Sequence, residues 1–291
     1  MTTETTQPHR LEDEFTSEHH VYEPHKVGLP PLGSYVRELW KRREFALELA
    51  RTNLRAQHFN TVFGQLWLII NPLLLAAVYF ILVDILRSGS RGDEFFAHLM
   101  AGLFAYYFFQ QSLNQGVRSV VSGGRLILNT AFPRALLPIS SVITAAMRFV
   151  PTALIYIPVH LITGLPVGPG LLWLIPIGAI LAVFAMGMTM LVAVGQVYFR
   201  DLKSFLPYAT RIWLYATPIL YYADEVRARG YEWMLHVNPL APIITSWSTV
   251  IDNGQAPPLD DMLIGLAWAV GTFLVAAVFF VSREREFAVR L

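Results

Sequence analysis

Six long, largely apolar stretches constrain this chain more than any other feature of its sequence. Each approaches the length of about 20 residues that an α-helix needs to cross the hydrocarbon core of a bilayer. Charged residues make up only 15% of the chain, against roughly 25% in ordinary soluble domains, and they gather between the stretches. The sequence therefore predicts an all-α integral membrane protein with six transmembrane helices. These helices are expected at residues 62–86, 95–117, 138–163, 171–197, 205–222 and 262–281.

The distribution of lysine and arginine between these stretches predicts the orientation of the chain. Loops that remain in the cytoplasm are enriched in these two residues. Most of them fall on the side that holds both termini, whereas the opposite side holds Arg87, Arg91, Arg227 and Arg229. An even number of spans leaves both termini on the same side. We therefore expect a multi-pass protein of the plasma membrane with cytoplasmic N- and C-termini.

The residues outside the spans divide into three parts with different expected structures. Residues 1–33 are polar and predict a disordered cytoplasmic tail. Residues 34–60 predict a basic amphipathic helix that Ser34 caps and that lies in the cytoplasmic membrane interface. A solvated linker helix is the alternative for this segment. The six-span domain would then occupy residues 61–282, and residues 283–291 would form a second cytoplasmic tail.

A short apolar segment in the cytoplasmic connection after the second span is a candidate docking helix. Gly123 and Gly124 interrupt the preceding helix, and the seven residues that follow can make about two helical turns. A helix this short cannot span a membrane, but its apolar side chains could enter a groove on another protein. An ordinary turn back to the membrane is the alternative. The candidate residues are Arg125, Leu126, Ile127, Leu128, Phe132 and Arg134.

The external connection at residues 223–257 is too long for a simple turn, and it contains two further apolar segments. Neither segment is long enough to cross, so they predict helices that dip partway into the outer leaflet as a gate. Irregular backbone at that depth must be covered by protein or line a cavity. A flat lid at the interface is the alternative. The candidate gate residues are Trp233, Asn238, Pro239 and Trp247.

Several kinds of chemistry are missing from the sequence. It contains no cysteine, no phosphate-binding P-loop, no nucleophile elbow and no histidine spacing typical of a metal site. A net charge of +1 gives the chain no strong positive potential that would attract nucleic acid. We therefore expect neither an enzyme nor a nucleic-acid-binding protein, and no cofactor or metal bound by this chain.

Arg148 and a group of aromatic residues are candidates for a translocation path. Arg148 falls near the middle of the third span, where a charge must face protein or water, so it could attract an anionic substrate. A purely structural charge is equally compatible with this position. Aromatic faces could let sugar rings slide, or could simply anchor helices. The aromatic candidates are Tyr106, Tyr107, Phe108, Trp213 and Tyr215.

A series of short motifs, in a specific order over about residues 34–290, resembles a known family of permeases. The motifs are Gly64-Gln65-Leu66-Trp67, Phe132-Pro133-Arg134, Phe199-Arg200-Asp201-Leu202, Pro218-Ile219-Leu220-Tyr221 and Asn238-Pro239-Leu240. The chain resembles the ABC-2 type permease subunits that export O-antigen, teichoic acid and related lipid-linked polysaccharides across the bacterial inner membrane. The sequences of the predicted amphipathic helix at residues 34–60 and of the fourth and fifth spans are most similar to those of actinobacterial members that export cell-wall galactan.

The resemblance implies an assembly and a cargo that the residues alone do not. It implies a homodimer, with the path at the dimer interface, and two copies of a separate P-loop ATPase that bind ATP and Mg. It places the coupling helix at residues 125–132 and the gate helices within residues 224–251. Its implied cargo is a polyprenyl-diphosphate-linked glycan, handled in contact with membrane lipids.

Three other functions remain open from the sequence. ABC-2 permeases that export a drug or a simple lipid share the same layout. A membrane enzyme acting on polyprenyl lipids would need a cluster of acids or histidines at an interface. An autonomous channel would need rings of polar residues along its pore.

Overall fold

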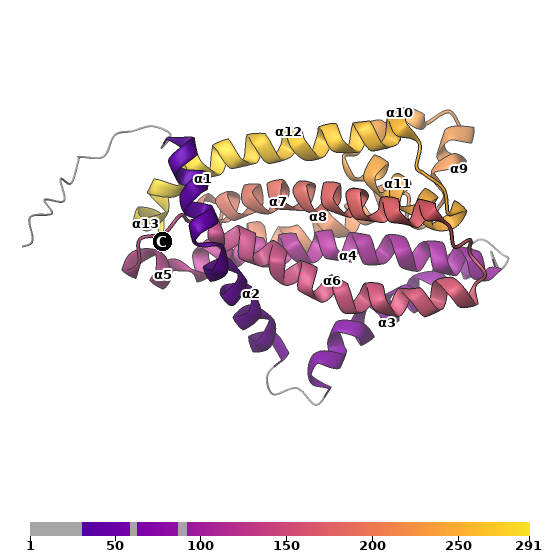
Figure 1. The fold of residues 1–291 in the computed structure, drawn as a ribbon, viewed down its shortest axis with the longest axis horizontal. Helices are drawn as coiled ribbons and strands as arrows, with labels where there is room; N and C mark the ends of the chain where they lie inside the picture. The colour runs from indigo at the N-terminus through magenta and orange to yellow at the C-terminus, as the bar shows by residue number, and fades with distance from the viewer. Residues whose placement is uncertain (1–30, 59–62, 87–91) are drawn as a thin grey trace, which may run out of the picture.

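The computed structural model describes residues 31–58, 63–86 and 92–291, and most of these residues lie in helices (Figure 1). No β-strand is present in these three ranges, which confirms the all-α prediction. The predicted disordered tail lies outside the described residues except at its last three positions. Arg87 and Arg91, which contribute to the predicted orientation, also lie outside them.

Three of the predicted spans are confirmed as helices long and apolar enough to cross a membrane. They correspond to the third, fourth and sixth predicted spans, and α3 (Trp67–Leu86), at the first, contains a shorter apolar stretch. The chain is therefore a multi-pass helical membrane protein, while a count of six spans stays a prediction. Among the described residues, the qualifying stretches are Leu136–Ile162, Pro169–Tyr198 and Leu259–Arg290, which are built on α6 (Leu136–Ile162), α7 (Leu174–Tyr198) and α12 (Leu259–Arg283).

The second and fifth predicted spans differ from the expectation in length or polarity. α4 (Gly92–Ser122) packs against α3, α6, α7 and α8, so its polar residues are surrounded by other helices. α8 (Leu202–Ala216) is only 15 residues long, so the predicted end at residue 222 is wrong. Thr217 is extended, with φ −101° and ψ 141°, because it precedes Pro218, whose ring disfavours helical backbone at the residue before it.

The predicted amphipathic helix at residues 34–60 is two helices. α1 (Leu32–Lys41) and α2 (Arg43–His58) are separated at Arg42, whose backbone is not helical. α1 begins two residues before Ser34, so the predicted cap is wrong, and the Ser34 hydroxyl instead donates to the Pro31 carbonyl. On α1, Leu32, Val36 and Trp40 are exposed while Tyr35 and Leu39 are half-buried, whereas α2 packs on α6.

Small residues let the membrane helices approach one another closely. A Cβ atom added to Gly116 of α4 would lie 2.1 Å from a Thr189 methyl group of α7. One added to Gly187 of α7 would lie 2.8 Å from the backbone of Phe273 in α12. Neighbouring membrane helices commonly use such contacts, because lipid provides little hydrophobic drive for helices to associate.

The two ends of the helical bundle carry different short elements (Figure 1). One end, the terminal end, holds α1, α5 (Gly124–Asn129), the 3₁₀ helix η3 (Glu284–Glu286) and α13 (Phe287–Arg290). The other, the distal end, holds α9 (Ala223–Ala228), α10 (Glu232–Val237) and α11 (Leu240–Asn253). The 3₁₀ helices η1 (Gly64–Leu66) and η2 (Pro169–Trp173) precede α3 and α7.

Candidate functional site

The predicted docking helix is present at the terminal end as α5, and its two faces differ. Ile127 is buried, with 5% of its surface exposed, and it packs into the core between α4, α7 and α12. Leu128 is 63% exposed and Arg125 is also exposed, while Leu126 is half-buried. A docking protein would therefore meet Arg125 and Leu128, and Ile127 instead holds α5 on the bundle.

A polar hollow adjoins α5 on the side of α2. Its volume is about 510 Å³, and side chains from α2, α4, α5 and α6 line it. Arg118 and Arg125 contribute its two cationic groups, and Asn53 and Asn114 contribute amides. The lining residues include no carboxylate. The hollow and the exposed face of α5 together form a continuous candidate docking surface.

Two of the predicted docking residues make contacts within this chain. The ring of Phe132 packs against the ring of Phe45 in α2, with centroids 5.4 Å apart. The Arg134 guanidinium donates a hydrogen bond to the backbone carbonyl of Glu284 in η3. Phe132 and Arg134 are both half-buried, so they position α5 from its C-terminal side.

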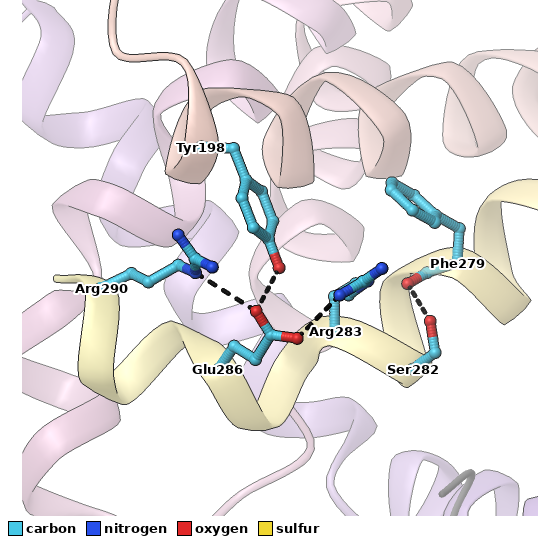
Figure 2. Close-up of polar contacts among 6 residues, drawn as sticks. All are labelled: Tyr198, Phe279, Ser282, Arg283, Glu286 and Arg290. Carbon is cyan, nitrogen blue, oxygen red and sulfur yellow. Dashed lines mark hydrogen bonds and ion pairs between the residues drawn. The ribbon is translucent and has the colours of Figure 1, made fainter.

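The last residues of the chain, predicted only as a cytoplasmic tail, form an ordered cluster centred on Glu286 (Figure 2). The Glu286 carboxylate accepts from the Tyr198 hydroxyl at 2.7 Å, from Arg283 at 2.9 Å and from Arg290 at 3.2 Å. Arg290 also lies over the Tyr198 ring, 4.3 Å from its centroid. Phe287 is fully buried and packs on Phe280 of α12. The spacing of Arg283, Glu286 and Arg290 by three and four residues is the sequence signal that could have predicted this helical turn.

The same C-terminal segment also contacts α1. The Tyr35 hydroxyl of α1 donates to the Glu284 carboxylate at 2.6 Å. Burial, together with the Glu284 carboxylate, raises the pKa of the Tyr35 hydroxyl well above its ordinary value, so the hydroxyl keeps the proton that it donates. Through Arg134 and Tyr35, the C-terminal segment joins α1 to the connection that follows α5.

The path candidates on α4 occupy three different environments. Tyr106 is buried and its hydroxyl donates to the Thr210 carbonyl of α8. Phe108 is also buried, and its ring lies 5.9 Å from that of Phe149. Tyr107 is half-buried beside Arg148, so of the three it is the one that lies next to a charged group.

Arg148 itself lies between two membrane helices rather than in open space. Its Nη1 atom is 3.3 Å from the Gln111 Oε1 atom of α4, and the side chain is half-buried on α6. Hydrogen bonding to a neighbouring helix is how a charge at this depth is stabilised. Of the two alternatives for Arg148, this contact favours the structural one, although a role in the path stays a prediction.

The path candidate Trp213 and the gate candidate Asn238 bind each other directly. The Trp213 indole donates to Asn238 Oδ1 at 2.7 Å, and Asn238 Nδ2 donates to the Ala216 carbonyl at 2.9 Å. The same Asn238 oxygen accepts from the backbone N–H of Leu240. Asn238 therefore joins the end of α8 to the beginning of α11. Tyr215, by contrast, is 47% exposed and lies beside Tyr79 of α3.

The remaining gate candidates are distributed over α10 and α11. Trp233 is 60% exposed on α10, and Pro239 occupies the N-cap position of α11. Trp247 is half-buried and packs 6.1 Å from the Phe149 ring of α6. Most of α11 is buried among α4, α7 and α12, as expected of a helix that enters the bundle. In the described part of the chain, no group of three His, Cys, Asp or Glu side chains could hold a metal ion.

These features define a helical, multi-pass membrane protein that carries α5, a short and partly exposed helix, at its terminal end. The chain belongs to the family of O-antigen export system permease proteins, which are ABC-2 type permeases. No protein-family model matches it. It is 30% identical over 207 residues to the O-antigen export system permease protein RfbA of Klebsiella pneumoniae, an alignment that covers 71% of this chain and 79% of that protein.

A second relative extends the similarity over nearly the whole chain. The O-antigen export system permease protein RfbA of Myxococcus xanthus is 28% identical over 259 residues. That alignment covers 87% of this chain and 97% of the relative. The chain is accordingly a transport permease rather than an enzyme.

Proposed function

We propose that this chain is the membrane-spanning subunit of an ABC exporter for a polyprenyl-diphosphate-linked polysaccharide. It would move the polymer from the cytoplasm to the outer face of the bacterial inner membrane. The observation that carries this proposal is the similarity, over most of the chain, to permeases named for O-antigen export. Cell-wall galactan is the proposed polymer, on the resemblance to galactan exporters.

The energy for transport would come from a separate ATPase subunit, present in two copies, that binds ATP and Mg. Exposed Leu128 supports this part of the proposal, because an apolar side chain beside a polar hollow at the aqueous end gains stability when a partner covers it. In this arrangement the terminal end faces the cytoplasm, and α5 transmits movement of the ATPase to α4 and α6.

A second copy of the chain would complete the path along α8. One face of α8 is exposed at intervals of three or four residues, and it carries Tyr208, Arg211 and Tyr215. Arg211 lies in the middle of this helix, where facing lipid would be costly for a charge. In a polar path between two copies of the chain, Arg211 would be surrounded by water and by the tyrosine hydroxyls. This supports a homodimer with α8 at its centre.

The docking surface can be tested by purifying the chain from its native membranes in mild detergent. We expect a P-loop ATPase to co-purify in about equal amount with the wild-type chain. Leu128→Glu should reduce its recovery at least about tenfold, because a carboxylate cannot be buried unpaired in an apolar contact. Val167→Glu is the matched control, since Val167 is 68% exposed and lies in the connection between α6 and α7 at the distal end.

The outcome separates a docking role from general damage. Equal recovery of the ATPase with wild-type and Leu128→Glu chains would contradict docking at α5. Equal loss with Leu128→Glu and Val167→Glu would also contradict it, because an added charge anywhere would then suffice. A stable wild-type chain that purifies without any ATPase would overturn the proposed function itself.

A further inference from the structure

A small polar cavity at the distal end has no part in the docking surface or in the predicted path. Its volume is about 300 Å³, and it lies where the beginning of α4 and the end of α11 meet the segment before α9. The side chains that line it include three carboxylates, one histidine and several hydroxyl groups. Those that carry the argument are Glu94, His98, Tyr222, Thr245, Ser248 and Asp252.

Within this cavity several buried polar atoms have no hydrogen-bond partner. His98 is only 2% exposed, and its Nδ1 atom lies 2.7 Å from Oδ2 of Asp252. That contact leaves His98 Nε2 and Asp252 Oδ1 without partners, and the Thr245 and Ser248 hydroxyls also have none. A buried polar group without a partner is unfavourable by about 1–3 kcal/mol. Four such atoms around one cavity give a molecule with several hydroxyl groups places to form hydrogen bonds.

The charge of the cavity selects among such molecules. Glu94, Asp224 and Asp252 line it, while its single arginine, Arg227, is already paired with Asp224 at 3.0 Å and with Asp261 at 2.7 Å. Burial lowers the pKa of Arg227, but the hydrogen bonds that its guanidinium donates to Asp261 and Asp224 outweigh burial and raise the pKa, so Arg227 stays charged. Three carboxylates against one arginine leave the cavity with an excess of acidic groups, which disfavours a phosphate or an acidic sugar. The carboxylates favour neutral hydroxyl groups, which donate to carboxylate oxygens.

The size of the cavity suits a single sugar ring. Ligand sites in proteins span about 300–1,000 Å³, and this cavity lies at the lower limit. The Tyr222 ring lies 4.4 Å from the His98 ring, so an aromatic face adjoins the polar groups. Aromatic surface beside hydroxyl-binding groups matches the two kinds of surface that a sugar ring presents.

We propose that this cavity binds one neutral monosaccharide unit of the exported polysaccharide at the distal end of the permease. The proposal rests on the proposed function for the identity of the polymer. The site would hold a sugar unit against α11, so that the position of this helix depends on whether sugar is present.

The site can be tested on the purified full chain in detergent, without transport, by saturation-transfer NMR. The probes are methyl β-galactopyranoside, as a neutral sugar, and glucuronate, as an acidic one. We expect saturation transfer to the neutral sugar and none to glucuronate. Ser248→Ala and Thr245→Val, combined, should weaken binding of the neutral sugar about tenfold, because hydrogen bonds to the sugar are lost.

The variants and the control keep the test separate from effects on folding. Removing the two unpartnered hydroxyls leaves the contact between His98 and Asp252 in place, so Tm should not fall. Asp260→Asn is the matched control, because Asp260 is exposed on α12 and does not line the cavity. Binding should be unchanged in this control.

Two results would overturn the site. No saturation transfer to methyl β-galactopyranoside would mean that the cavity holds only water, and equal binding by the double variant would place the sugar elsewhere. Either result with an ATPase still co-purifying would reject the sugar site and leave the proposed exporter standing. Loss of ATPase co-purification from the wild-type chain would instead reject the exporter.

Discussion

α5 and α11 are both short, apolar helices in connections between membrane helices, yet they differ in how much of their surface the neighbouring helices cover. α11 buries most of its residues, including Leu240, Ile243 and Ile244, against α4, α7 and α12. α5 buries one residue, Ile127, and leaves Leu128 exposed. α11 therefore acts as part of the bundle, whereas α5 is a short helix on its surface.

The difference comes from position rather than from composition. Asn238, two residues before the start of α11, is bonded to the end of α8, so α11 is directed back among its neighbours. α5 projects from the terminal end and is held by α4 and α13. Apolar surface that the chain does not cover itself is the kind of surface that partners use. The comparison can be tested by three changes with progressively smaller effects.

Introducing a carboxylate into each helix should produce the largest contrast. Ile244 is fully buried, so Ile244→Asp would place a charge in the core and should lower Tm by at least about 10 °C or prevent purification. Leu128→Asp should leave Tm within about 2 °C of wild type, because the carboxylate stays in water. Thermal unfolding of the purified chain, followed by tryptophan fluorescence, measures both. Similar Tm values for the two variants would show that α11 is no more buried than α5.

Removing the junction that directs α11 should have an intermediate effect. Asn238→Ala leaves the Trp213 indole and the Leu240 N–H without their acceptor, which should destabilise the chain by about 2 kcal/mol and lower Tm by roughly 4–8 °C. Asn253→Ala, an exposed position at the other end of α11, serves as the control and should change Tm little. If both variants behaved alike, the junction would not be what directs α11.

Disrupting the ion pairs beside α5 should have the smallest effect. Glu286→Ala removes the contacts to Tyr198, Arg283 and Arg290 shown in Figure 2, but these ion pairs are partly exposed and contribute little to global stability. We expect an unchanged Tm together with faster tryptic cleavage near the C-terminus, measured by mass spectrometry over time. Glu232→Ala on α10 is the control. An unchanged cleavage pattern would mean that Phe287 alone holds the C-terminal segment in place.

The sequence by itself determined that the chain is helical and where three long apolar helices lie. Apolar length alone predicted α6, α7 and α12, because a spanning helix must satisfy its own backbone hydrogen bonds within one continuous segment. Paired glycines and apolar residues likewise predicted α5, and an apolar segment in the external connection predicted α11. These signals are local, so they can be read along the chain without knowing what lies beside it.

Only the tertiary structure decided which side chains face the core, the surface or one another. Trp213 and Asn238 were separate candidates for the path and the gate, and the fold joins them, whereas it buries Tyr106 and Phe108. His98 and Asp252 meet although they are 154 residues apart. Composition and periodicity describe neighbours along the chain, whereas these contacts depend on how whole helices pack. That packing determined the division between an exposed α5 and a buried α11.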